Sequence, residues 1–202
     1  MFVQVWKPPD EWSYAWLLGL FLGDGCLSQM PRTWTMRISM DAAYPDLIEQ
    51  AVMATQLVAI NSRVTTRNVT GSECVVVGCC WKGWPDAIPQ HGPGHKHTRP
   101  IVLAPWQQEI VDRHPWPFLR GLLHSDGCRT INRFSTKLPS GRVANYEYPR
   151  WFFSNLSDDI RELFCRTCEA VGVRWTQSNP RNISVSHRDS VAKLDEFVGL
   201  KA

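Results

Sequence analysis

Long hydrophobic runs are missing from this 202-residue chain. No apolar stretch approaches the roughly 18 residues that a membrane-spanning helix needs, although 44% of the residues are hydrophobic. Residues 1–10 also lack the charged-then-apolar pattern of a secretory signal peptide. We therefore expect a soluble, cytoplasmic protein without a membrane partner, folded as one large domain or as two of about 100 residues each.

Metal-binding cysteine pairs are equally scarce. Of seven cysteines, only Cys165 and Cys168 have the Cys-x-x-Cys spacing of zinc ligands, and no second pair completes a set of four. The pair also falls in a segment predicted to be helical. These features disfavour structural zinc and favour reduced, mostly buried thiols. The His-rich segment 91–97 likewise lacks the remaining parts of a histidine-metal nuclease.

Acidic residues are few in the segments predicted to form strands and turns, which are 26–40, 61–73, 129–150 and 173–188. These segments hold twelve lysines and arginines but only two acids, Glu73 and Glu147, although the net charge of the chain is only +3. A sheet surface this basic on an otherwise balanced protein indicates a polyanionic partner, most simply nucleic acid.

Two similar nonapeptides are the most informative feature that is present, LLGLFLGDG at residues 17–25 and LRGLLHSDG at residues 119–127. In each, two small residues stand four positions apart and therefore share one helix face. Because glycine inside a helix costs roughly 1 kcal/mol relative to alanine, such a strip indicates close packing against another helix. The predicted interface residues are Gly19, Gly23, Gly121 and Ser125.

Each nonapeptide also ends in an aspartate, Asp24 or Asp126. A carboxylate at the C-terminal end of a helix is unfavourable unless a cation is near, because the helix dipole is negative there. If the two helices pack along their small residues, both acids lie at one end of the interface. Two like charges in that position favour a bound divalent metal ion.

The same order of predicted elements follows both nonapeptides, which are 102 residues apart. We therefore predict an α+β fold of two αββαββα repeats related by a pseudo-twofold axis, with an N-terminal repeat at 1–100, a linker at 101–116 and a C-terminal repeat at 117–202. The first unit comprises a helix from 11 to 24, strands 26–30 and 33–40, a helix 45–57, strands 61–67 and 72–80, and a short helix 106–113 after an irregular stretch 84–100. The second comprises a helix 117–126, strands 127–137 and 142–154, a helix 158–170, strands 174–179 and 182–187, and a helix 188–198.

Two such motifs at half-length spacing, each opening an αββαββα unit, resemble the single-chain LAGLIDADG homing endonucleases over essentially the whole chain. The resemblance implies that the motif helices pack at the pseudo-twofold axis and that each repeat supplies a four-stranded antiparallel saddle for the DNA major groove. It also implies a monomer that hydrolyses one phosphodiester on each strand of a long double-stranded target and leaves 3′ overhangs. Because the two motifs differ, with Leu18 and Leu22 in one and Arg120 and His124 in the other, we expect the two halves to read different half-sites and the target to be asymmetric.

The resemblance also implies roles for particular residues. Asp24 and Asp126 would ligate Mg²⁺ or Mn²⁺, with the backbone carbonyls of Gly23 and Ser125 as auxiliary ligands. The acid that the family usually carries at the sixth motif position is replaced by Leu22 and His124, and Arg120 is charged on an otherwise apolar helix, so we expect it to point outward or onto DNA.

The family's active-site lysine is best matched by Lys96, for which an ordinary solvated loop lysine is the alternative. The second repeat offers only Arg188 or Lys193, which predicts unequal active sites. Asp41 and Asn155, near the ends of strands, would position water, and the alternative for both is a helix N-cap.

The predicted DNA-binding residues are the basic residues of the strands and turns, most of which we expect to contact phosphates rather than bases. They are Arg32, Arg37, Arg63, Arg67, Arg129, Arg133, Lys137, Arg142, Arg174 and Arg181. The alternative function is a cleavage-inactive nucleic-acid-binding protein on the same scaffold, such as a transcription regulator or an intron maturase. An intein is disfavoured, because the chain has no terminal Cys or Ser nucleophile and no final His-Asn.

Overall fold

The first half of the chain alternates helices with antiparallel hairpins. Its elements are α1 (Glu11–Asp24), β1 (Gly25–Gln29), β2 (Trp34–Asp41), α2 (Pro45–Val58), β3 (Val64–Asn68), β4 (Cys74–Trp81), α3 (Trp84–Ala87), the 3₁₀ helix η1 (Lys96–Thr98) and α4 (Pro105–Arg113). In this computed structural model, which describes residues 6–201, α1 is capped by Asp10, whose Oδ2 accepts a hydrogen bond of 2.7 Å from Ser13 N. The four strands form one antiparallel sheet in the order β1-β2-β4-β3.

The second half repeats this arrangement. Its elements are α5 (Pro115–Asp126), β5 (Gly127–Lys137), β6 (Val143–Ser154), α6 (Asp158–Ala170), β7 (Thr176–Asn179), β8 (Asn182–Val185) and α7 (Arg188–Phe197). The strand order β5-β6-β8-β7 is the same as in the first sheet. The predicted repeat of two four-stranded antiparallel sheets, each following a motif helix, is therefore confirmed.

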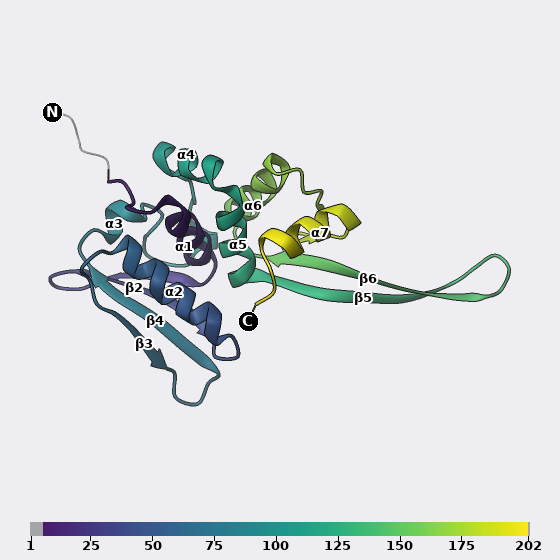
Figure 1. The fold of residues 1–202 in the computed structure, drawn as a ribbon, viewed down its shortest axis with the longest axis horizontal. Coiled ribbons are helices and arrows are strands. Elements are labelled where there is room, and N and C mark those ends of the chain that lie inside the picture. Colours follow the sequence, from purple (N-terminus) through teal and green to yellow (C-terminus); the bar gives the residue numbers. More distant parts are fainter. Residues whose placement is uncertain (1–5, 202) are drawn as a thin grey trace.

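Helices α1 and α5 pack against each other between the two sheets (Figure 1). At Gly19, an added Cβ would lie 2.9 Å from the backbone nitrogen of Leu122, and at Gly121 it would lie 2.7 Å from that of Leu20. Both distances are shorter than carbon and nitrogen atoms tolerate, so only glycine lets the two backbones approach this closely. The small-residue strips thus lie at the centre of the molecule.

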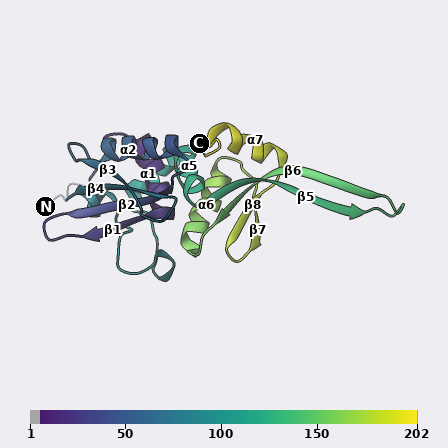
Figure 2. The same cartoon turned by 90° about the horizontal axis from the view of Figure 1, so that it is seen from below.

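Each sheet is covered by helices on one face and is open on the other. In β2, Met36, Ile38 and Met40 are buried, and the alternating residues Arg37 and Ser39 are exposed. In the second sheet, the ring of Phe153 stacks on that of Phe164 from α6, with 4.4 Å between centroids. Figure 2 shows the two sheets on opposite sides of α1 and α5. We call the faces that the helices leave uncovered the open faces.

The structure differs from the prediction in detail. The stretch predicted to be irregular contains the short helices α3 and η1, and α5 begins at Pro115, because proline is tolerated throughout the first helical turn. The segment predicted as a linker contains α4, as the predicted helix 106–113 required. Between residues 6 and 201, no helix combines the length and the hydrophobicity needed to cross a membrane.

Candidate active site

The C-terminal end of α1 is bound by the ammonium group of Lys96. Its Nζ donates hydrogen bonds to the carbonyl oxygens of Phe21, Leu22 and Gly23, over 2.6, 2.9 and 2.7 Å. A cation in this position stabilises the negative end of the helix dipole. Burial lowers the pKa of Lys96 to about 8, although the nearby charges of Asp126 and Asp24 raise it. Lys96 is thus a partly buried residue of the site rather than a solvated loop lysine.

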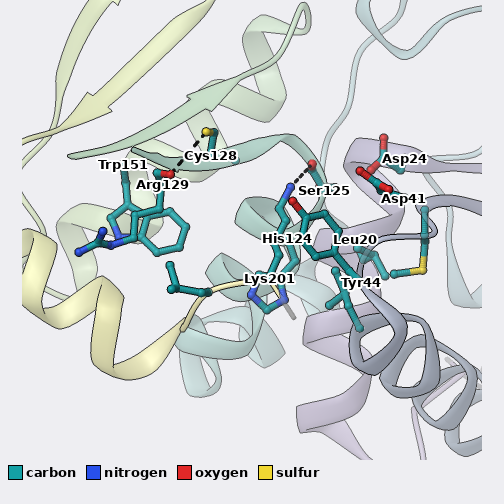
Figure 3. Close-up of a pocket in the computed structure, with 14 residues that line it drawn as sticks. Leu20, Asp24, Asp41, Tyr44, His124, Ser125, Cys128, Arg129, Trp151 and Lys201 are labelled. Atoms are coloured by element: carbon teal, nitrogen blue, oxygen red, sulfur yellow. Dashed lines mark hydrogen bonds between the residues drawn. The ribbon is translucent and has the colours of Figure 1, made fainter. Parts of the chain in front are cut away.

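The end of α5 is bound in a similar way by Lys201, which the sequence analysis missed. Its Nζ donates to the carbonyl oxygen of Ser125 over 3.1 Å, as Figure 3 shows. Of the two residues predicted instead, Lys193 bonds to the carbonyl of Val171, and Arg188 begins helix α7. One signal was available: Lys201 follows Lys96 by 105 residues, close to the 102-residue spacing of the motif acids.

The two motif acids meet where α1 and α5 end. A Cβ placed on Gly23 would lie 3.0 Å from Asp126 Oδ2, which shows how closely that carboxylate approaches α1. Burial and then the charge of Asp126 raise the pKa of Asp24 to about 6, despite the opposing effects of Lys96 and Lys201. Burial also raises the pKa of Asp126. The site therefore concentrates negative charge in the way that favours a bound cation.

Asn155 holds one of these acids in place. Its Nδ2 donates to Asp126 Oδ2 over 2.6 Å, and its Oδ1 accepts a hydrogen bond of 2.8 Å from Ser157 N. Asp41 makes only the second kind of contact, because its Oδ1 accepts from Ala43 N over 2.9 Å. Neither residue is the helix N-cap of the alternative prediction, because Tyr44 takes that position for α2 and Ser157 for α6. Each side chain accepts from the backbone N–H two residues on, and Asn155 in addition orients Asp126. The two halves of the site are unequal in this respect.

A pocket of about 520 Å³ opens beside Asp24, lined by the first half of the chain, by the end of α5 with the start of β5, and by the C-terminal segment (Figure 3). Asp24, Asp41, Tyr44, His124 and Lys201 are among its lining residues. Burial lowers the pKa of His124 to about 4, so its imidazole is neutral at pH 7. The histidine that replaces a motif acid therefore adds no charge to the site.

The donor atoms at the site are oxygens, which suits a hard divalent cation such as Mg²⁺ or Mn²⁺. They are the carboxylates of Asp24 and Asp126 and the backbone carbonyls of Gly23 and Ser125. Each of the two carbonyls also accepts a hydrogen bond from a lysine ammonium. Within the described part of the chain, no three His, Cys, Asp or Glu side chains cluster as metal ligands. The carboxylate pair is therefore the feature that fits a metal ion.

The cysteines are less buried than expected. Cys165 and Cys168 are buried in α6, where burial raises the pKa of Cys165 to about 12. Cys26, Cys80 and Cys128 are exposed. Cys26 and Cys128 directly follow the two Asp-Gly pairs, where the chain leaves the helix for the open face, which explains their exposure.

Several predicted DNA-binding residues lie on the open faces or in exposed turns. Arg37 and Arg67 share the open face of the first sheet, because their cross-strand partners, Gly78 and Val76, are two residues apart on β4. Arg37 also donates to Ser28 Oγ over 2.6 Å. The exposed residues outside the strands are Arg32, Arg63, Arg142, Arg174 and Arg181.

Arg129 and Arg133 lie elsewhere than predicted. Arg129 pairs across the sheet with the buried Trp151, so it shares the helix-covered face, where its Nε donates to Asp195 over 2.8 Å. Arg133, four residues further along β5, lies on the same face as Arg129, and its Nε is 3.0 Å from a carboxylate oxygen of Glu147. Lys137 also falls on this side. All three side chains therefore lie on the face opposite to the open face. Arg129 and Arg133 are in addition paired with carboxylates.

Arg120 also differs from its prediction. Its Nη2 donates to Gln50 Oε1 of α2 over 2.7 Å, and the side chain is partly buried between the halves of the chain. It points neither outward nor toward the open faces. Arg150, one of the twelve basic residues of the strand and turn segments, lies on an open face, since it is opposite Thr130 and two residues from Phe152.

Comparisons with known proteins show what this arrangement resembles. No protein-family model matches the sequence, and the comparison with the curated proteins found no match. The structure is similar to I-DmoI in complex with DNA and Mn, with 15% identity, a TM-score of 0.58 and coverage of 95% of this chain and 98% of that one. It is also similar to the LAGLIDADG meganuclease I-AabMI bound to uncleaved DNA, with 12% identity, a TM-score of 0.55 and coverage of 93% and 82%.

A third similar structure is the I-LtrWI LAGLIDADG homing endonuclease bound to target DNA, with 8% identity, a TM-score of 0.57 and coverage of 93% and 82%. At these identities the likeness is one of fold. The chain therefore has the two-sheet α+β fold of the LAGLIDADG homing endonucleases over nearly its whole length, with a pair of acids at the junction of its central helices.

Proposed function

We propose that this chain is a LAGLIDADG homing endonuclease that cuts a long, asymmetric double-stranded DNA target. It hydrolyses one phosphodiester on each strand, leaves 3′ overhangs, depends on Mg²⁺ or Mn²⁺ and works as a monomer, with one repeat at 1–100 and the other at 117–202. The observation that carries the proposal is the convergence of Asp24 and Asp126 at the ends of paired helices, with a lysine bound beside each. A protein that only bound DNA would gain nothing from holding two carboxylates together.

Each residue of the site has a role in this proposal. Asp24 and Asp126 hold the metal, and Asn155 keeps the Asp126 carboxylate in a fixed orientation. Lys96 and Lys201 place positive charge beside the acids, where it would stabilise the charge that develops on a phosphate. A divalent metal ion bound there would activate water and stabilise the leaving oxygen. Asp41 would position water in the half of the site that lacks an asparagine.

The test is a cleavage assay on the DNA that surrounds the gene, joined as it would be without the insertion. The protein is incubated with this DNA in Mg²⁺, Mn²⁺ or Ca²⁺, and the product ends are sequenced. We expect one nick in each strand at a single site, with the two nicks offset so that they leave 3′ overhangs. EDTA should abolish both nicks. Specific binding without cleavage in Mg²⁺ or Mn²⁺ would identify the binding-only alternative instead, and the absence of any binding would contradict both.

The open faces predict a steep dependence of DNA affinity on salt. If about six phosphates are contacted, the affinity should fall roughly a thousand-fold between 50 and 200 mM salt, because condensed counterions are released on binding. Replacing Arg37 by glutamine should reduce the slope of log K against log salt by about one. Fluorescence anisotropy across a salt series measures both quantities. A flat response would contradict the assignment of these faces to DNA.

Replacing either lysine by methionine should slow cleavage by roughly a hundred-fold, as expected when a group that acts on the reacting phosphate is lost. Because Lys96 and Lys201 bind different helix ends, the two variants should differ in which strand they cut more slowly. Strand-resolved single-turnover cleavage measures this effect. Lys82→Met, at an exposed turn, is the matched control and should cleave normally. Unchanged rates in both site variants would contradict these roles.

A further inference from the structure

The hairpin of β5 and β6 extends well beyond the second sheet. Strand β6 pairs with β8 only at residues 151–154, so the eight cross-strand pairs from Thr130–Arg150 to Lys137–Val143 form a two-stranded ribbon with no third strand in the described chain. In the first sheet, by contrast, all eight residues of β2 pair with β4. Figures 1 and 2 show the ribbon projecting away from the rest of the molecule.

The two faces of this ribbon differ in chemistry. The face that continues the helix-covered side has two polar pairs at its centre, with Arg133 bonded to Glu147 over 3.0 Å and Ser135 to Asn145 over 2.6 Å, and the pairs Ile131–Pro149 and Lys137–Val143 at its two ends. It carries no aromatic ring. The face that continues the open side consists of the pairs Thr130–Arg150, Asn132–Tyr148, Phe134–Tyr146 and Thr136–Ala144. These four pairs include three aromatic rings, one positive charge and no negative charge.

The aromatic rings of this face are organised, yet exposed. The rings of Phe134 and Tyr146 stack with 5.1 Å between centroids, and the two residues are 45% and 44% exposed. Tyr148 lies edge-on to Phe134, and the Arg150 guanidinium lies 5.5 Å from the Tyr148 ring. A clustered apolar surface that no other part of the described chain covers is typical of a binding surface.

We infer that the aromatic face of this ribbon lies in the DNA major groove and recognises thymine methyl groups in the outer part of one half-site. This inference rests on the proposed function. The major groove admits a two-stranded ribbon, and thymine is the base that presents a methyl group there for apolar contact. The face is continuous with the open face of the second sheet, and its only charge, Arg150, is complementary to phosphate.

The length of the ribbon sets the size of the contact. Eight residue pairs at about 3.3 Å per residue span roughly 26 Å, which corresponds to about eight base pairs of DNA. The first sheet has no hairpin that extends unsupported in this way. The half-site read by the second half of the chain is therefore longer than the other, and its outer end is enriched in A·T pairs with thymine methyls facing the ribbon.

The test is a binding selection from a randomised duplex library in Ca²⁺, using the full chain and the double variant Phe134→Ala/Tyr146→Ala. The native chain should select thymine at several positions at one outer end, and the double variant should lose that preference while keeping the central sequence. Ile131→Ala is the matched control, because it removes an apolar side chain, 44% exposed, from the opposite face of the same ribbon. It should select the same sequence as the native chain.

A second measurement isolates the methyl group. Replacing the selected thymines with deoxyuridine, which lacks the methyl, should weaken binding of the native chain roughly four-fold per contacted position and should leave the double variant unaffected. Equal affinity of the native chain for both duplexes would overturn the inference, and so would an unchanged selection by the double variant. A concentration-dependent dimer that the double variant abolishes would overturn it too, because the face would then bind a second copy of the chain. Selection of no sequence at all would instead overturn the proposed function.

Discussion

Replacing Asp24 or Asp126 by asparagine is expected to abolish double-strand cleavage while leaving DNA affinity largely unchanged. Asparagine preserves the shape of the side chain but removes a charge that would bind the metal ion. Substituting a residue that only supports a metal ligand typically lowers activity about 10- to 100-fold. Loss of a ligand itself should therefore reduce the cleavage rate by more than about a hundred-fold. Single-turnover cleavage in Mg²⁺ and binding in Ca²⁺ measure the two effects separately.

The same variants provide an internal check on folding. Burial and the charge of Asp126 raise the pKa of Asp24 to about 6, so the ionised carboxylate destabilises the metal-free protein at pH 7. Asparagine removes this repulsion, and we expect the melting temperature of metal-free Asp24→Asn to be at least that of the native chain. Glu109→Gln, on the exposed side of α4, is the matched control and should change neither cleavage nor binding. Full cleavage by Asp24→Asn would contradict the metal-ligand assignment.

Substituting Gly121 is expected to have the largest effect on stability. The Cβ of an alanine there would meet the backbone of Trp16 and lie 2.7 Å from that of Leu20, neither of which can rotate away as a side chain would. The two central helices must therefore separate. Overpacking in a core commonly costs roughly 1–3 kcal/mol. Because the added Cβ meets backbone atoms of α1 rather than movable side chains, we expect Gly121→Ala to cost about 3 kcal/mol or more.

Thermal and urea unfolding measure this loss, which corresponds to a decrease in melting temperature of roughly 6–12 °C for a chain of this size. Gly78→Ala is the matched control, because its Cβ would lie 3.5 Å from Thr65 Oγ1, an ordinary contact distance. We expect less than about 1 kcal/mol there. Cleavage should also fall in Gly121→Ala, since Asp24 and Asp126 meet only where these helices pack. A native melting temperature would show that the interface can relax, contrary to the packing described above.

The sequence by itself determined the repeat, the helix and strand boundaries to within a few residues, and the pair of motif acids. These features are local: helix caps, alternating strand patterns and small residues at helical spacing each depend on neighbours in the chain. The spacing of the two nonapeptides then placed the acids in equivalent positions. Lys96 was named from the resemblance to the LAGLIDADG family, as the best match to that family's active-site lysine, and not from a local pattern.

Tertiary structure alone decided which other residues join the site and which strand face each basic residue takes. Lys201 meets Ser125 across 76 residues of chain, so no local pattern predicts this contact. Asn155 was predicted from the sequence to position water, but its hydrogen bond to Asp126, 29 residues away, is visible only in the structure. The outer part of β5 is exposed on both faces, so it shows no alternation of burial from which the face of Arg133 or Phe134 could be assigned. Only the register with β6, counted from the buried Trp151, separates the paired polar face of the ribbon from its aromatic face.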